Sequence, residues 1–282
     1  MNEEVTVIII GHKSKSLILN YIKPIHEKFK IIIIDNSDDF DLTDIIRKNY
    51  PNILIKNVKN DGYGAAINYG SKLVKTKYFL ISNPDLTGIN ENSLNKFTQT
   101  AKKLNDKFST LGPRYEHANP KTLIQSNKQI EISEFKVISG ACMFFNKRNF
   151  ETIGGFDENF FMYLEENDFC LRSLNINKNY QINSINVYHN AGNSVSYDNI
   201  AEKELHEYLR TWHFMWSKFY FYKKRYTIMI AFLIFLPIIF RLILRIIFHS
   251  FFGKKKQLKK YKTRWSGLIN SIIGNKSKLR VN

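Results

Sequence analysis

Short runs of consecutive apolar residues alternate, in the first half of the chain, with longer stretches whose apolar residues recur every three or four positions. A run that is apolar at every position predicts a strand covered on both faces, and the stretches between the runs predict crossover helices. This order is typical of an open α/β fold whose parallel sheet is flanked by helices. The predicted strands are residues 5–10, 31–35, 52–56 and 78–82.

Polar residues follow three of these runs directly. Gly11 comes after the first run, Asp35 ends the second, and Asn83-Pro84-Asp85 follows the fourth. In open α/β sheets, ligands bind at the carboxyl ends of the strands, so these residues are candidates for a binding site. Asp35 has the chemistry to hydrogen-bond a nucleotide base or ribose, and a turn-forming role for the sequence Asp-Asn-Ser is equally compatible.

The segment NDGYGAAINYG, residues 60–70, places Gly62 and Gly64 just before a predicted helix. Glycine at that point allows the backbone to approach a phosphate closely, although a simple loop uses the same residues. The segment lacks both the Walker sequence and the Gly-x-Gly-x-x-Gly dinucleotide fingerprint. It therefore indicates a nucleotide site only together with other features.

Two further features suggest a divalent cation. Asn83 and Asp85 flank a proline, and their hard oxygen ligands suit Mg²⁺ or Mn²⁺ carrying a diphosphate, although such sequences also form ordinary loops. The segment NYQINSINVYH, residues 179–189, predicts two short strands that end at His189. A histidine at a strand end is more often structural than a metal ligand.

The segment FMYLEENDFCLR, residues 161–172, contains three carboxylates, Glu165, Glu166 and Asp168, and Arg172 follows four positions after the last of them. Taken alone, the segment is explained by an acidic first turn of a helix, where carboxylates favour the positive end of the helix dipole. Asp168 and Arg172 have the spacing of an ion pair on a helix surface.

The net charge of +17 belongs to the C-terminal part of the chain. From Lys223 onward there are fifteen Lys and Arg and no Asp or Glu, which leaves 27 basic against 25 acidic residues in the first 222. A near-neutral body with a cationic tail argues against a basic nucleic-acid-binding fold, so we expect no nucleic-acid partner. Cys142 and Cys170 lie in apolar strings, which predicts buried free thiols.

The tail also contains fifteen uncharged residues, 226–240, fewer than the roughly 20 that a membrane span needs. Beyond them, Arg241, Arg245 and His249 recur every four residues, which predicts a cationic stripe on one helix face. The pattern favours a helix lying in the interface of an anionic membrane, with a tilted or re-entrant span and a buried helix as alternatives.

Taken in order, these pieces resemble the inverting glycosyltransferases of family 2, and within it the rhamnosyltransferase-like branch. The resemblance extends over about residues 4–196 and does not cover the tail. The segments that carry it are IIIIDNSDD, NDGYGAAINYG, ISNPDL, GACMFFNKRNFETIGGFDENFFMYLEENDFCLR and YHNAGNSVS.

The resemblance implies a GT-A fold over residues 1–200, which is an α/β fold with a mixed, mainly parallel sheet flanked by helices. It has a nucleotide-sugar-binding half (1–113) and an acceptor half (114–200). A helical connector (201–225) and a membrane-associating tail (226–282) would follow. It implies that a metal, Mg²⁺ or Mn²⁺, is held by Asp85, Asn83 and His189. The nucleotide-binding residues that it implies are Gly11, Asp35, Asn60, Gly64, Asn68 and Asn83.

The same resemblance makes Glu166 the catalytic base, with Glu165 and Asp168 as orienting or acceptor-binding groups. The family usually has Asp at the position of Glu166, and the longer side chain raises the question of whether activity is lowered. The alternative is a non-catalytic sugar-nucleotide-binding or scaffold protein.

The implied partners are a dTDP- or UDP-sugar, possibly dTDP-L-rhamnose, and a glycan or polyprenyl-diphosphate-linked acceptor in bacterial surface polysaccharide synthesis, lipopolysaccharide included. The N-terminus lacks the pattern of a signal peptide. We therefore expect a peripheral or monotopic enzyme on the cytoplasmic face of the bacterial inner membrane.

Overall fold

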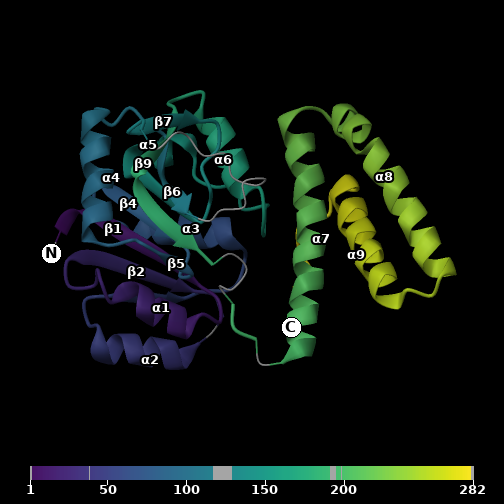
Figure 1. Ribbon diagram of the computed structural model, residues 1–282, viewed down its shortest axis with the longest axis horizontal. Coiled ribbons are helices and arrows are strands. Elements are labelled where there is room, and N and C mark those ends of the chain that lie inside the picture. The colour runs from purple at the N-terminus through teal and green to yellow at the C-terminus, as the bar shows by residue number, and fades with distance from the viewer. Residues whose placement is uncertain (1, 38, 117–128, 191–194, 198, 281–282) are drawn as a thin grey trace. The chain divides into compact units, whose positions relative to one another are not determined.

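The computed structural model describes residues 2–37, 39–116, 129–190, 195–197 and 199–280 (Figure 1). The chain divides into two compact units. We call residues 1–157 with 166–196 the sheet unit, and residues 158–165 with 197–282 the helical unit.

The sheet unit is built on one mixed sheet with the strand order β3-β2-β1-β4-β8-β6-β9-β5, and β7 pairs with β9. β1, β2, β3 and β4 pair in parallel, β8 runs antiparallel to β4 and β6, and β6 and β9 are parallel. This arrangement confirms the predicted α/β fold. The strands are β1 Asn2–Gly11, β2 Phe29–Asp35, β3 Leu54–Asn57, β4 Tyr78–Ser82, β5 Leu86–Thr87, β6 Thr110–Glu116, β7 Ile132–Phe135, β8 Cys142–Asn146 and β9 Asn179–His189.

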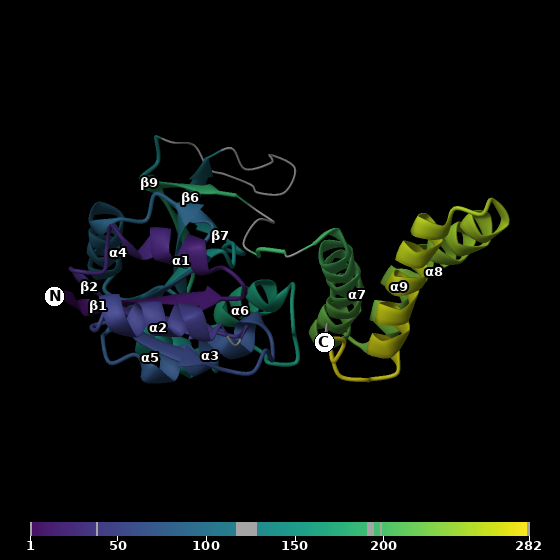
Figure 2. The same cartoon turned by 90° about the horizontal axis from the view of Figure 1, so that it is seen from below.

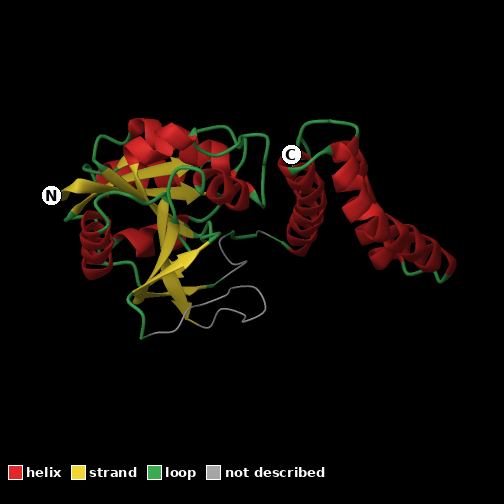
Figure 3. Ribbon diagram, turned by 90° about the horizontal axis from the view of Figure 1, so that it is seen from above, coloured by secondary structure: helices red, strands yellow, loops and turns green. Residues whose placement is uncertain are grey.

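Helices cover both faces of the sheet (Figure 3), as its continuously apolar strands require. Successive residues of β1 enter different cores: Val7 and Ile9 pack with α1, α2 and α4, whereas Ile8 and Ile10 pack with α3, α5 and α6. The helices are α1 Lys15–Ile22, α2 Phe40–Asn49, α3 Tyr63–Leu73, α4 Glu91–Lys103, α5 Lys147–Ile153 and α6 Glu165–Ser173.

Strand β9 differs from the two short strands that the sequence predicts. It is continuous, and its pairing with β6 shifts between Pro113, opposite Ile182, and Arg114, opposite Asn186. Three extra residues of β9 therefore stand at the shift, next to a proline that has no N–H for the ladder. The bulge preserves one strand where the sequence pattern suggests a break.

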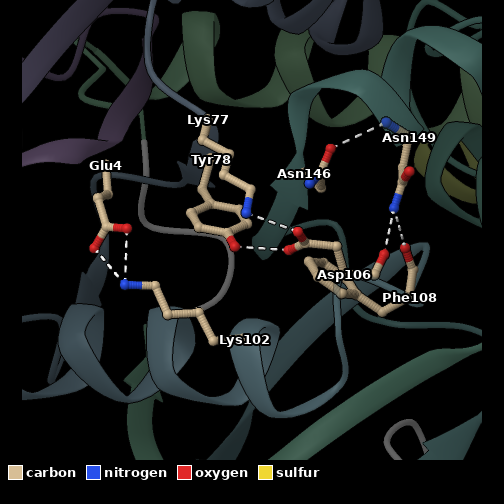
Figure 4. Close-up of polar contacts among 8 residues, drawn as sticks. All are labelled: Glu4, Lys77, Tyr78, Lys102, Asp106, Phe108, Asn146 and Asn149. Carbon is tan, nitrogen blue, oxygen red and sulfur yellow. Dashed lines mark hydrogen bonds and ion pairs between the residues drawn. The ribbon is translucent and has the colours of Figure 1, made fainter.

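Polar contacts hold the amino-terminal end of β4 (Figure 4). The Lys77 ammonium lies 2.7 Å from Asp106 Oδ2, and the Tyr78 hydroxyl donates to Asp106 Oδ1 at 2.6 Å. Asn149 Nδ2 donates to the carbonyl oxygens of Asp106 and Phe108, both at 2.8 Å. Burial raises the pKa of Asp106, but the hydrogen bonds from Lys77 and Tyr78 outweigh it and leave that pKa below its usual value.

The helical unit contains α7 Ile200–Arg225, α8 Ile228–Phe251 and α9 Lys255–Ile272 (Figure 2). Phe219 of α7, Phe235 of α8 and Leu268 of α9 meet in a shared apolar core. α7 and α9 approach so closely that a Cβ on Gly267 would lie 2.4 Å from the Trp212 carbonyl oxygen. The apolar run at residues 226–240 belongs to a longer helix, α8, which contains Pro237 and extends to Phe251. By length and composition α8 is long and apolar enough to cross a membrane.

Candidate active site

The first part of the site lies where β1 and β2 end side by side. Gly11 and Asp35 are paired in register, and a Cβ on Gly11 would lie 2.7 Å from Ile18 Cδ1 and 3.2 Å from Asp35 Oδ1. Only glycine therefore fits beside the carboxylate of Asp35 without displacing these neighbours.

Asp35 is fully buried, and its own loop surrounds its carboxylate. Ser37 Oγ donates to Oδ1 at 2.7 Å, and the Asp39 N–H donates to Oδ2 at 3.0 Å. Burial raises the pKa of Asp35, while these hydrogen bonds act in the opposite direction. Asp39 in turn caps α2 by accepting from the Leu42 N–H. Asp35 thus shapes the loop that follows β2, whatever ligand it contacts.

The glycine-rich segment reaches the same edge. Asn60 Oδ1 accepts a 3.4 Å hydrogen bond from Asn36, the residue after Asp35. Gly62 has φ of 111°, a conformation that favours glycine, and it is the N-cap of α3. Gly64 is buried in the first turn of that helix. Asn60 and Gly64 therefore flank the ends of β1 and β2.

Asn68 has a different environment. Its Nδ2 donates to the Phe156 carbonyl and its Oδ1 accepts from the Phe156 N–H, both at 2.9 Å. A Cβ on Gly155 would lie 2.7 Å from Asn68 Oδ1, and Gly155 has φ of 65°. Asn68 therefore connects α3 to the turn at Gly154 and Gly155. Its nucleotide-binding role stays a prediction.

Asp85 and His189 come together at the next part of the edge. His189 ends β9 beside Leu86 of β5, and its Nε2 lies 3.3 Å from Asp85 Oδ1. The Asp85 side chain is almost fully buried, yet within the described part of the chain neither of its carboxylate oxygens has a hydrogen-bond partner. Buried polar groups are normally hydrogen-bonded, so this carboxylate is suited to a ligand.

These residues suit a divalent cation. A cluster of three or more His, Cys, Asp or Glu is not present among the residues described. Mg²⁺ is commonly held by one or two carboxylates together with phosphates of the substrate, so the Asp85 carboxylate, with His189 beside it, is a suitable protein contribution. The buried Asp85 oxygens fit that role. The ligand role of the Asn83 amide stays a prediction.

Glu166 stands in the first turn of α6, half-buried against the loop before β8. A Cβ on Gly140 would lie 3.2 Å from Glu166 Cβ and 3.6 Å from its Cδ, so glycine leaves space for the carboxylate. Burial raises the pKa of Glu166, against hydrogen bonds from the N–H groups of Glu166 and Asn167. A raised pKa makes a carboxylate a stronger base.

A short chain of contacts joins the two carboxylate sites. The Asn83 N–H donates to the Ala141 carbonyl at 2.9 Å, and Gly140, the neighbour of Ala141, packs against Glu166. Tyr63 at the start of α3 donates its hydroxyl to the Gly140 carbonyl at 2.9 Å. The loop at 140–141 therefore links the Asn83–Asp85 turn, the glycine-rich segment and the proposed base.

Asp168 and Arg172 form the ion pair that their spacing predicts. Arg172 Nε donates to Asp168 Oδ2 at 2.8 Å, and its other nitrogens donate to the carbonyl oxygens of Ile153 and Gly155. Arg172 thereby ties α6 to the end of α5. Asp168 orients this arginine, which is a positioning role. Glu165 is buried at the start of α6.

The residues before Glu165 are held within the helical unit. Tyr163 and Leu164 have φ of 72° and 69°, which is rare for bulky side chains and costs energy. Arg210 of α7 donates to the Tyr163 hydroxyl at 2.7 Å, and Ser217 donates to the Met162 carbonyl at 2.7 Å. These contacts maintain the strained backbone directly before the acidic pair.

Sequence reasoning missed Tyr63, the 140–141 loop and Arg210. The Ser-Gly pair before the apolar run at 141–145 signalled a turn, but nothing local to it indicates that Glu166 packs there. Arg210 lies 47 residues from its partner Tyr163, a pairing without a local signal.

The chain is similar to known proteins. Residues 6–199 match the domain described as Glycosyl transferase family 2. The low-salt glycan biosynthesis hexosyltransferase Agl10 of Haloferax volcanii is 27% identical over 213 residues, which are 67% of this chain and 68% of that protein.

Two solved structures share the fold. The mannosyltransferase PcManGT of Pyrobaculum calidifontis, in complex with GDP-Man and Mn²⁺, matches 96% of this chain and 88% of its own with a TM-score of 0.59 at 10% identity. GalNAc-T7 with UDP, GalNAc and Mn²⁺ matches 66% of this chain with a TM-score of 0.55 at 13% identity, and this chain spans 43% of its length. The fold is of the GT-A type, and the chain belongs to glycosyl transferase family 2.

Proposed function

We propose that this protein is a metal-dependent, inverting glycosyltransferase that moves a hexosyl residue from a nucleoside-diphosphate sugar to a hydroxyl of a glycan or lipid-linked acceptor. The observation that carries the proposal is the environment of Asp85. Its Oδ1 lies 3.3 Å from His189 Nε2, and neither of its buried carboxylate oxygens has a hydrogen bond within the described residues. The proposed base, Glu166, is joined to this turn by the loop at 140–141.

The chain's own residues divide the chemistry between them. Glu166 takes the proton from the acceptor hydroxyl as that oxygen forms its bond to the anomeric carbon. The bond from the anomeric carbon to the diphosphate breaks on the opposite face, and the nucleoside diphosphate leaves with the bonding electrons. A divalent cation, when bound, neutralises the departing diphosphate. Asp85, His189 and Asn83 would hold that cation.

The donor's nucleoside fits the edge beside β1 and β2. Gly11 leaves room next to Asp35, and Asn60 and Gly64 flank the same place. We assign residues 1–113 to donor binding and 114–200 to the acceptor side. A hexose is favoured by the relative from Haloferax volcanii, whose name describes a hexosyltransferase of glycan biosynthesis. L-Rhamnose from dTDP-rhamnose, and a role in bacterial surface polysaccharide, are the narrower form of the proposal.

The helical unit supports attachment to a membrane surface. The outward face of α8 carries large apolar side chains, among them Met229, Leu233, Phe240 and Phe251, which are 64–84% exposed. At 1.5 Å per residue α8 is about 36 Å long, but Arg241 and Arg245 lie in its second half, deep in any span. We therefore propose that α8 lies in the interface, with the lysines of α9 toward anionic headgroups.

Calorimetric titration with nucleoside diphosphates and their sugars tests the proposal. The titrations are run with Mn²⁺, with Mg²⁺ and with a chelator. We expect one nucleotide to bind only when metal is present, and its sugar to release the nucleoside diphosphate slowly when no acceptor is added. Absence of binding under every condition would favour a non-catalytic membrane scaffold.

A further inference from the structure

A cavity of about 550 Å³ lies between α7 and α9 within the helical unit. Its apolar surface comes from Leu205, Leu209 and Trp212 of α7 together with Leu258 of α9. The size of the cavity is that of a small-molecule site.

The rim of this cavity is cationic. Lys255, Lys259 and Lys262 stand at spacings of four and three, which places them on one face of α9, and Arg280 closes the C-terminal side. Among the described residues that line the cavity there is no Asp or Glu. The rim therefore gathers four cationic side chains.

Aromatic contacts fix two of these cations in place. Lys259 Nζ lies 4.2 Å from the centre of the Tyr208 ring, and the Arg280 guanidinium lies 3.6 Å from that of Phe161. Arg280 also donates to the Ser277 carbonyl oxygen at 2.9 Å. Such contacts hold a cation at the rim while leaving its charge available to an anion.

A second cavity on the same pair of helices shows what distinguishes the first. It measures about 410 Å³, and its lining includes Glu207 together with Arg210, Lys256, Lys260 and Arg264. Lys256 is also paired with Glu204 at 2.9 Å. Acidic side chains therefore offset part of its positive charge. The first cavity has an apolar floor and no acidic residue among the described residues of its lining, so it is the better match for an amphiphile that carries a negative charge.

We propose that the cavity between α7 and α9 binds one anionic phospholipid of the membrane. Its phosphate would lie among Lys255, Lys259, Lys262 and Arg280, and the first part of its hydrocarbon chains would lie on the leucines and Trp212. The site deepens the membrane attachment proposed above and rests on it. This site would make membrane attachment selective for an anionic headgroup. The apolar face of α8 contacts hydrocarbon and does not distinguish between headgroups.

Native mass spectrometry of the full-length protein in a non-ionic detergent tests the site. The probes are dioleoylphosphatidylglycerol, dioleoylphosphatidylcholine and inorganic phosphate. We expect one phosphatidylglycerol to be retained at concentrations about tenfold below those needed for phosphatidylcholine. Equal retention of the two lipids, or equally tight binding of inorganic phosphate, would overturn the proposal.

Charge-matched variants separate the cavity from general surface charge. Changing Lys255, Lys259 and Lys262 to Gln should weaken retention of phosphatidylglycerol about tenfold or more, since each basic residue near an anionic headgroup contributes to binding. The control changes Lys254, Lys260 and Lys276 to Gln, which removes the same charge outside the cavity lining. Similar losses in both variants would mean that the lipid binds to diffuse charge and not to this site.

Thr263→Trp fills the cavity without changing any charge, and it should abolish the retained lipid if the floor is used. Thr211→Trp, in the second cavity, is its control. The variants are compared only when their melting temperatures match the parent. Lipid retention is read without turnover, and Glu166→Gln should retain the lipid fully, so an inactive protein would leave the result intact.

Discussion

Two carboxylates near opposite ends of β4 have opposite surroundings. Asp106, beside the amino end, accepts hydrogen bonds from Tyr78 and pairs with Lys77 (Figure 4). Asp85, three residues past the carboxyl end, is more deeply buried and within the described chain has only the imidazole of His189 at 3.3 Å.

The different surroundings suggest different roles: Asp106 stabilises the fold, and we propose that Asp85 binds a ligand. A hydrogen bond to a charged group stabilises a fold, whereas a buried carboxylate without such bonds destabilises it. Asp106 belongs to the first class. Asp85 has a cost to the folded state that a bound cation would offset, which is typical of a ligand site. Glu166, whose pKa burial raises, belongs with Asp85.

Glu166→Gln should give the largest effect. Removing the base should lower turnover by about 10²- to 10⁴-fold while the donor still binds, because the amide cannot accept the proton. Nucleoside diphosphate release and donor titration measure the two quantities. Glu134→Gln, at an exposed ion pair with Lys178, is the matched control and should be fully active. Turnover retained by Glu166→Gln would move the base elsewhere.

Asp85→Asn tests the other half of the comparison. Metal-dependent donor binding should weaken by about 10- to 100-fold, while the free energy of unfolding without metal should stay the same or rise. Calorimetry with Mn²⁺ and urea denaturation with chelator provide the two readouts. A large loss of stability with unchanged metal dependence would instead make Asp85 and His189 a structural pair.

Asp106→Asn should show the reverse. Its side chain is 31% exposed, so we expect a loss of about 1 kcal/mol in the free energy of unfolding, with activity unchanged. The folded-state pKa of Asp106 lies below its usual value of 3.8. The extra stability is therefore full above that usual value and disappears as the pH falls through the folded pKa. Urea denaturation from pH 7 to pH 3 should show the parent and variant converge.

The pH profile of turnover should give the smallest effect. Burial raises the pKa of Glu166 above its usual value of 4.5, and the base acts in its deprotonated form. Turnover should therefore rise with pH and level off, with the inflection above pH 4.5. Donor binding, measured in the same buffers, should lack this inflection. A profile with its inflection at or below 4.5 would contradict Glu166 as the base, because burial raises the pKa of that carboxyl.

The local sequence was sufficient for several parts of the molecule. The runs at 5–10, 31–35 and 78–82 became β1, β2 and β4, because strands buried on both faces must be apolar at every position. Cys142 and Cys170 are buried and free, as their apolar surroundings predict. Asp168 and Arg172 pair because their spacing alone brings them to one helix face. The segment YHNAGNSVS was only partly testable, since residues 191–194 lie outside the described ranges.

By itself, then, the sequence determined what depends on period and on neighbours: the α/β layer, the acidic helix start and the charge of the tail. Tertiary structure decided which distant side chains meet. Asn68 hydrogen-bonds to the backbone of Phe156, which lies 88 residues away in the sequence. β9 is one continuous strand because a bulge accommodates three extra residues. His189 reaches Asp85 only because β9 pairs with β5. Such contacts depend on strand order and register, which hydrophobic periodicity does not encode.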